Sequence, residues 1–145
     1  MSQAPQVELD RSVGYILKRA QSALHNALEA RLRSHGLSVS QYACLELLAQ
    51  RPGLSQSELA RGAFVTRQAM HQLAAGLQSA GLITSRDDGR ARRLQLTAVG
   101  KRKLRAASRA AAAVEGEMLA GLDDAQRRAL HDSLASCIDS LALDR

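Results

Sequence analysis

The sequence has few aromatic residues, few cysteines and no long apolar run, and each absence excludes a class of protein. It contains no tryptophan, and its only aromatic residues are Tyr15, Tyr42 and Phe64. A core of leucine, alanine and valine favours helices. No stretch approaches the roughly 18 apolar residues that span a bilayer, and the polar start at residues 1–5 does not resemble a signal peptide. These features predict a globular, cytoplasmic protein without a membrane partner.

The cysteines and histidines do not form a recognisable metal or redox motif. Cys44 and Cys137 are far apart in the sequence, and the four histidines show neither HxxxH nor Cys/His spacing. We therefore expect no structural disulfide, no metal and no other cofactor. No nucleophile elbow, P-loop, dinucleotide fingerprint or pair of catalytic carboxylates occurs, so we do not expect an enzyme.

The net charge of +6 is concentrated in one short segment. Residues 86–105 contain eight basic and two acidic residues, so the rest of the chain is neutral in total. Like charges gathered in this way predict a surface that faces a polyanion. A solvated basic face has the same signature, and charge alone leaves both interpretations open.

Hydrophobic periodicity and capping signals predict the order helix, helix, helix, helix, hairpin, helix, helix. The fold class is therefore mainly α with a small β-hairpin. The expected hairpin pairs residues 82–86 with residues 93–97 across a turn rich in aspartate and glycine. The expected helices begin at or next to Leu9, Ser38, Ser55, Thr66, Thr97 and Asp123.

The third and fourth expected helices form a helix-turn-helix, whose second helix lies in the major groove of DNA. Arginine suits guanine there, and glutamine suits adenine. An ordinary solvent-exposed helical face is the alternative. Gly76 is unfavourable inside this helix, and close helix packing is one explanation. The candidate DNA contacts in this unit are Ser55, Thr66, Arg67, Gln68, His71 and Gln72.

The hairpin that follows has the composition of a wing. Arginine side chains on such a turn can enter the narrow, electronegative minor groove. For Arg90 the alternative is a surface ion pair with Asp88. Basic charge continues as far as Arg105, so we expect the DNA-facing surface to extend past the hairpin. The candidate DNA contacts of the wing are Arg86, Asp88, Arg90 and Arg92.

Several motifs resemble the MarR family of transcriptional regulators. The similarity runs from about Leu9 to Leu143. It implies a single domain over residues 1–145, with a winged helix-turn-helix at residues 38–97 and a helical dimerisation region at residues 9–36 and 98–143. The motifs are Gln41-Tyr42 through Leu48, Ser57-Glu58-Leu59-Ala60, Thr66-Arg67-Gln68, and Asp88-Gly89-Arg90 leading to Leu94-Gln95-Leu96-Thr97.

The resemblance also implies a homodimer that acts as a repressor on a near-palindromic DNA operator and is released by a small molecule. Apolar stripes on the first and last helices agree with such a dimer, because one small core does not need them. A two-fold dimer sets its two recognition helices one helical turn of DNA apart, roughly 34 to 36 Å.

In this family a ligand pocket lies between the dimer helices and the DNA-reading unit. Tyr15, His35 and Tyr42 are candidates to line it around a small aromatic or phenolic ligand, although scarce aromatics can simply fill the core. Cys44 is a candidate oxidant sensor, but its helical position favours a packed, inert thiol. The alternative functions are therefore a thiol-based redox regulator and a helical protein-interaction module without DNA function.

Overall fold

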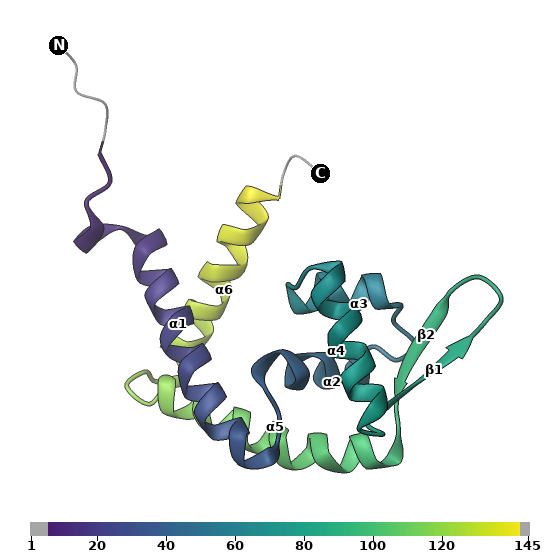
Figure 1. The fold of residues 1–145 in the computed structure, drawn as a ribbon. Coiled ribbons are helices and arrows are strands. Elements are labelled where there is room, and N and C mark those ends of the chain that lie inside the picture. Colours follow the sequence, from purple (N-terminus) through teal and green to yellow (C-terminus); the bar gives the residue numbers. More distant parts are fainter. Residues whose placement is uncertain (1–5, 143–145) are drawn as a thin grey trace.

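The computed structural model describes residues 6–142, which form a mainly helical chain with one antiparallel hairpin (Figure 1). The polar start at residues 1–5 and Leu143, the end of the expected dimerisation region, lie outside the described residues. The two strands are β1, Ile83–Asp87, and β2, Arg92–Leu96. The helices are α1 Val13–Leu32, α2 Val39–Gln50, α3 Gln56–Ala63, α4 Arg67–Ser79, α5 Ala98–Met118 and α6 Asp124–Leu141.

Side-chain caps explain where most of these helices begin. Ser38 and Asp123 form complete capping boxes at α2 and α6, each with a glutamine three residues later. Ser55 caps α3 by accepting the backbone amide of Glu58 at 3.2 Å, without the reciprocal bond of a complete capping box. The predicted starts of these three helices are confirmed. A cap joins residues within one turn of the chain, so the sequence alone is enough to locate it.

The first helix begins later than predicted, and a short 3-10 turn follows its end. Residues Leu9–Arg11 form a separate 3-10 turn, and α1 begins after Ser12, whose hydroxyl accepts the amide of Tyr15 at 3.1 Å. A second 3-10 turn at Arg33–His35 follows α1, and Gly36 ends that turn with a φ of 68°. The serine cap explains why the helix does not extend back to Leu9.

The core lies where α2, α3, α4 and the hairpin meet the first half of α5. Leu45, Leu59, Met70 and Leu77 are almost completely buried there, as their helical spacing predicts. Ala49, near the end of α2, is exposed and lines a cavity between α2 and α5. The first turn of α5 also packs against this core and closes one side of it.

The start of α5 is held directly against the foot of the hairpin. The Thr97 hydroxyl donates to the carbonyl of Gly81 at 2.6 Å and accepts the amide of Gly100 at 3.0 Å. The Thr97 amide donates to the Leu82 carbonyl at 3.1 Å. A Cβ atom on Gly100 would overlap that same carbonyl, so this close approach requires glycine.

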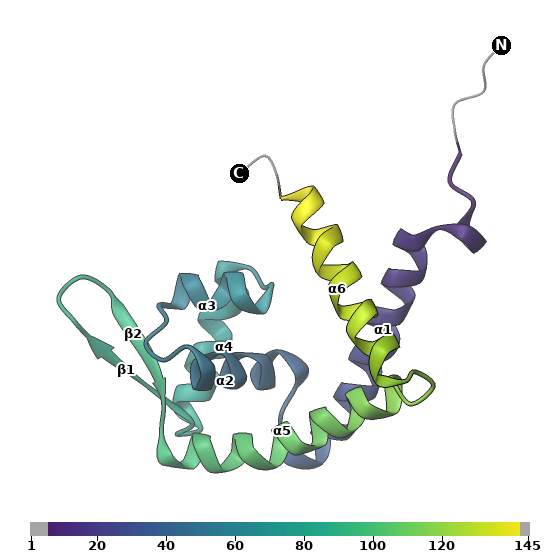
Figure 2. The same ribbon diagram turned by 180° about the vertical axis from the view of Figure 1, so that it is seen from behind.

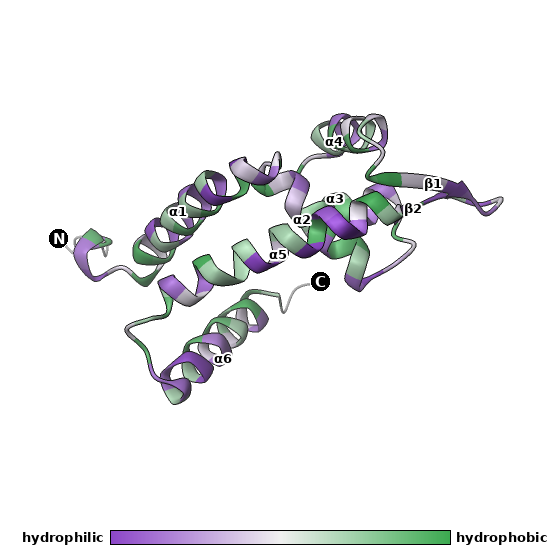
Figure 3. Cartoon of the chain, turned by 90° about the horizontal axis from the view of Figure 1, so that it is seen from below, coloured by the Kyte–Doolittle hydropathy of each residue, from purple (hydrophilic) through white to green (hydrophobic). Residues whose placement is uncertain are grey.

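Much of the apolar surface of α1 and α6 has no partner in the described chain, although α1 also packs against α5. They diverge from the far end of α5, as Figures 1 and 2 show from opposite sides, and Figure 3 shows hydrophobic patches along both. Only Leu32 is buried in α1, and no residue of α6 is buried. Cys137 is also exposed. The exposed apolar residues of these helices include Val13, Ile16, Leu17, Leu130, Ile138 and Leu141.

Within residues 6–142, no helix combines the length and the apolar character needed to cross a membrane.

Candidate nucleic-acid interface

A tight turn joins α3 to α4 and sets the angle between them. Phe64 ends α3 in the left-handed conformation, with a φ of 58°, and its side chain is 94% exposed. The amide of Val65 then reaches back to the Ala60 carbonyl at 3.1 Å. Thr66 caps α4 by accepting the amide of Ala69 at 3.1 Å. The predicted helix-turn-helix is confirmed, with Ser55 and Thr66 at the starts of its two helices.

The two faces of α4 differ in chemistry. The inner face carries Met70, Ala74 and Leu77, which are all buried. The Nδ1 atom of His71 lies 3.4 Å from the side-chain nitrogen of Gln56 at the start of α3. This arrangement presents hydrogen-bonding groups along one exposed helical surface. The exposed residues of the outer face are Arg67, Gln68, His71, Gln72 and Ala75.

Close helix packing does not explain Gly76. A Cβ atom added to this residue would meet no other atom within 4 Å, apart from its own helical surroundings. Its φ is not positive, so the backbone does not require glycine either. The structure gives no physical reason for glycine at this position.

The hairpin after α4 projects from the core as a two-stranded wing. Its register runs from Ile83 opposite Leu96 to Asp87 opposite Arg92, so the strands lie one residue from the predicted ranges. The amide of Leu94 donates to the Leu54 carbonyl at 2.9 Å, which ties β2 to the segment before α3. The wing therefore holds a fixed position beside the helix-turn-helix.

Asp88 organises the turn at the tip of the wing. Its carboxylate accepts the backbone amides of Arg90 and Ala91, both at 3.0 Å. The same carboxylate accepts a hydrogen bond from Nε of Arg93 at 3.1 Å. The alternative in which Arg90 forms an ion pair with Asp88 is wrong, because Arg93 takes that place across the hairpin. Asp88 therefore stabilises the turn by accepting hydrogen bonds from the residues that follow it.

Arg93 is the residue of this site that sequence reasoning missed. Besides Asp88, its guanidinium donates to the Gly53 carbonyl at 3.2 Å and lies 3.5 Å from the Glu58 carboxylate. It therefore joins the wing, the loop before α3 and α3 itself. The pairing of Asp88 with a residue five positions later, across a predicted turn, is the signal that could have identified it.

The other arginines of the wing remain open to a partner. Arg86, Arg90 and Arg92 are exposed, and none forms an ion pair with another described residue. Figure 3 shows the outer half of the wing as hydrophilic. Together with the outer face of α4, the wing offers cations and hydrogen-bonding groups on a rigid frame, which suits a nucleic-acid duplex.

The basic residues of α5 do not adjoin the N-terminal end of α4, where Arg67 lies. The first turn of α5 contacts Gly81 and Leu82, which follow the C-terminal end of α4. Arg67 lies at the other end of this 13-residue helix, about 20 Å away at the usual helical rise. The basic segment thus divides into a wing part and an α5 part at the wing's foot.

Acidification below about pH 4 is expected to loosen the wing turn. Backbone hydrogen bonds from Ala91 and Arg90, followed by the Arg93 side chain, lower the pKa of Asp88 from 3.8 to about 2. Because the charged carboxylate makes these bonds, its stabilisation is complete above pH 4 and is lost as the pH falls towards 2. The amide NMR shifts of Arg90 and Ala91, whose N–H groups donate to Asp88, should follow this titration.

An Asp88→Asn variant provides the control for this titration, because it should show a loosened turn at neutral pH and no acid transition there. A parent midpoint near pH 4 would show that the carboxylate is not held by the turn.

One of the three candidate ligand residues lines a cavity. Tyr42 faces a space of about 390 Å³ between α1, α2 and α5, whereas Tyr15 and His35 do not line it. Glu46 and Glu115 line the same cavity, and one buried oxygen of Glu46 has no hydrogen-bond partner among residues 6–142. Burial, followed by these two carboxylates, raises the pKa of Tyr42 above its ordinary value.

Cys44 is completely buried in the core, with its sulfur 4.0 Å from that of Met70. Burial raises the pKa of this thiol to about 11, so the thiolate that reacts with oxidants is scarce at neutral pH. Within the described residues, no group of three or more histidine, cysteine or acidic side chains could hold a metal ion.

Comparison with known proteins assigns the family. Residues 35–94 match the MarR family. The chain is 37% identical to the HTH-type transcriptional repressor Rv2887 of Mycobacterium tuberculosis over 122 residues, which cover 82% of this chain and 88% of the relative. The solved Rv2887–DNA complex superimposes with a TM-score of 0.75 at 34% identity, over 88% of this chain and 98% of that one.

Rv2887 has also been solved with salicylic acid, with the same identity and TM-score over 88% of this chain and 97% of that chain. The sequence identity and the superposition of the chain on Rv2887 lead to the same family assignment. The chain belongs to the MarR family of transcriptional regulators.

Proposed function

We propose that this protein represses transcription by binding duplex DNA as a homodimer in the cytoplasm, and that it is not an enzyme. The observation that carries the proposal is the exposed polar face of α4 beside a wing whose free arginines project from a fixed turn. The related repressor Rv2887, solved with DNA, supports it.

In the proposed complex, α4 reads bases and the wing contacts the neighbouring groove. Arg67, Gln68, His71 and Gln72 have the hydrogen-bonding groups that base edges in the major groove require. Arg90, assisted by Arg92, supplies charge to the minor groove and to phosphates. Ser55 and Thr66 present hydroxyls at helix N-termini, where phosphate contacts are common.

The proposed dimer buries the apolar stripes of residues 9–36 and 98–143. In the described part of one chain, residues such as Ile16, Ile138 and Leu141 are exposed, with fractions of 56%, 67% and 89%. A soluble chain rarely leaves such a surface open to water. A two-fold partner would cover it and set two recognition helices on one near-palindromic operator.

We further propose that the Tyr42 cavity takes a small phenolic ligand in its uncharged form. The unpartnered oxygen of Glu46 can accept a hydrogen bond from a phenol hydroxyl, while Leu24 and Leu28 contact its ring. Two carboxylates in the wall disfavour an anion there. The solved complex of Rv2887 with salicylic acid supports an aromatic ligand for a protein of this type.

The salt dependence of duplex binding tests the main proposal. Each phosphate contact releases counterions, so the slope of log affinity against log salt should be about −0.9 per contact and steep overall. Affinity would be measured by fluorescence anisotropy on duplexes selected from a random pool. A helical protein-interaction module predicts no salt-dependent binding, and a flat slope would exclude the DNA-binding proposal.

The redox alternative has less support, because Cys44 is buried and its thiol is held protonated. Peroxide-induced release of DNA that disappears in Cys44→Ser would revive it.

A further inference from the structure

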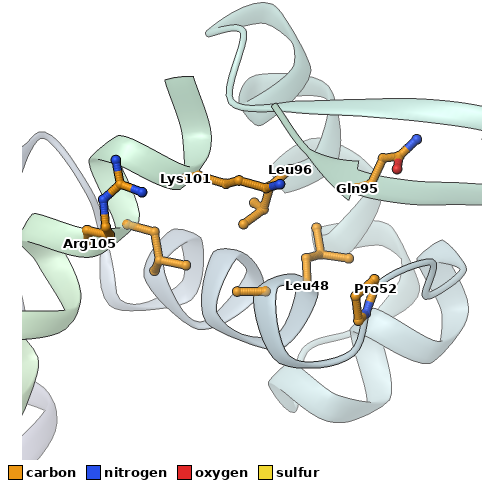
Figure 4. A pocket seen from close by; sticks show the side chains of 8 residues that line it. Leu48, Pro52, Gln95, Leu96, Lys101 and Arg105 are labelled. Atoms are coloured by element: carbon orange, nitrogen blue, oxygen red, sulfur yellow. The ribbon is translucent and has the colours of Figure 1, made fainter. Parts of the chain in front are cut away.

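A second cavity lies on another side of α2, between the end of that helix, strand β2 and the start of α5. Its volume is about 370 Å³, within the range of small-molecule sites. In Figure 4, Pro52 and Gln95 lie at one end, Arg105 lies at the other, and Lys101 extends beside Leu96. None of these residues belongs to the DNA contacts or to the ligand site proposed above.

The wall of this cavity is largely apolar. Leu48 of α2, Leu104 of α5 and Leu96 of β2 face it, and the first two are only 2% and 6% exposed. Because these two side chains pack into the core, most of the apolar surface open to a ligand comes from Leu96, which is partly exposed, and from Ala49 and Pro52, which are exposed. A flat hydrocarbon group can displace water from this surface, which favours its binding.

Two cations flank the apolar wall. Lys101 and Arg105 are four residues apart on α5 and therefore lie on the same face of the helix. Neither forms an ion pair with another described residue, and no acidic residue lines the cavity. Like charges at this spacing repel each other, so an anion between them would relieve the repulsion.

Lys101 and Arg105 lie away from the proposed DNA contacts of α4. They follow the Thr97 contact with Gly81, at the end of α4 opposite to Arg67. The charges also separate the two cavities, because the Tyr42 cavity has two carboxylates and no cation in its wall. An anionic ligand is therefore favoured in one cavity and disfavoured in the other.

We propose that the cavity between α2, β2 and α5 binds a small amphipathic carboxylate, with its hydrocarbon part against Ala49, Pro52 and Leu96, over the buried Leu48 and Leu104, and its carboxylate between Lys101 and Arg105. Because Leu96 belongs to the wing, the ligand contacts the foot of the hairpin directly.

Binding of 2-naphthoate and of its uncharged analogue 2-naphthamide to the full chain tests this proposal. Calorimetry would give the affinities, and methyl NMR shifts of Leu48, Leu96 and Leu104 would locate the ligand. We expect naphthoate to bind there more tightly than naphthamide. In Lys101→Gln/Arg105→Gln, naphthoate affinity should fall about tenfold, while naphthamide affinity changes less than about twofold.

The matched control is Arg102→Gln/Arg109→Gln, which removes the same charge from exposed positions of α5 outside the cavity. It should retain naphthoate affinity within about twofold. Equal losses in both double variants, absence of binding, or shifts at Leu24 and Leu28 instead would each overturn the proposal. The titration contains no DNA, so its result is independent of the proposed DNA binding.

Discussion

Gly100→Ala is expected to lower the free energy of unfolding by about 3 kcal/mol, the effect of forcing an extra carbon into a packed site. The new Cβ atom would overlap the carbonyl of Leu82, which is backbone and cannot rotate away. That carbonyl already accepts the Thr97 amide. The foot of the wing and the first turn of α5 would have to separate. Urea denaturation followed by circular dichroism measures the change.

Gly116→Ala is the matched control on the same helix. A Cβ atom there meets nothing within 4 Å, so alanine should stabilise α5 by about 0.5 to 1 kcal/mol through its better helix propensity. The two substitutions are chemically identical and should have opposite signs. If Gly100→Ala unfolds within about 1 kcal/mol of the parent, the packing of α5 against the wing is not as described.

Arg90→Ala is expected to weaken binding to most duplex sequences by about tenfold and to reduce the salt slope by about one. The side chain is exposed at the tip of the wing, while its backbone amide is held by Asp88. Alanine keeps that amide, so the variant should lose the contact and retain the shape of the turn. Anisotropy titrations at several salt concentrations would measure both quantities.

Arg102→Ala removes the same charge from α5 and serves as the control. We expect its duplex affinity to change by less than about twofold, because α5 begins at the end of α4 away from Arg67. Parent-like affinity in Arg90→Ala would refute the wing assignment. An equal loss in Arg102→Ala would instead support the earlier expectation that the DNA-facing surface extends along α5 to Arg105.

The helix-turn-helix and the wing could be predicted from the sequence because their signals are local. Serine or aspartate followed by glutamine marks the starts of α2 and α6, and these caps act within one turn of the chain. The spacing of Met70 and Leu77 likewise fixes which face of α4 is buried. The strand boundaries differed by one residue, because pairing with the opposite strand determines them.

The candidate site was predicted less completely, because its charges depend on neighbours distant in sequence or across a turn. Arg93 rather than Arg90 pairs with Asp88, since only the folded hairpin shows which side chain crosses the turn. Close packing failed to explain Gly76, whereas the close approach that does require glycine is at Gly100. Of the residues proposed for a ligand, Tyr42 lines the cavity between α1, α2 and α5, whereas Tyr15 and His35 do not line it.

Hydrophobic periodicity, capping signals and the basic segment by themselves determined a mainly helical protein with one basic hairpin, and the few aromatics and cysteines limited what its core could be made of. Only the tertiary structure decided how that charge is used, because α5 turns away from the wing after Thr97 and carries Lys101 and Arg105 to a cavity beneath it. Composition records how many charges a segment holds. Which surface or cavity each charged side chain faces is decided by packing between segments that are far apart in the chain.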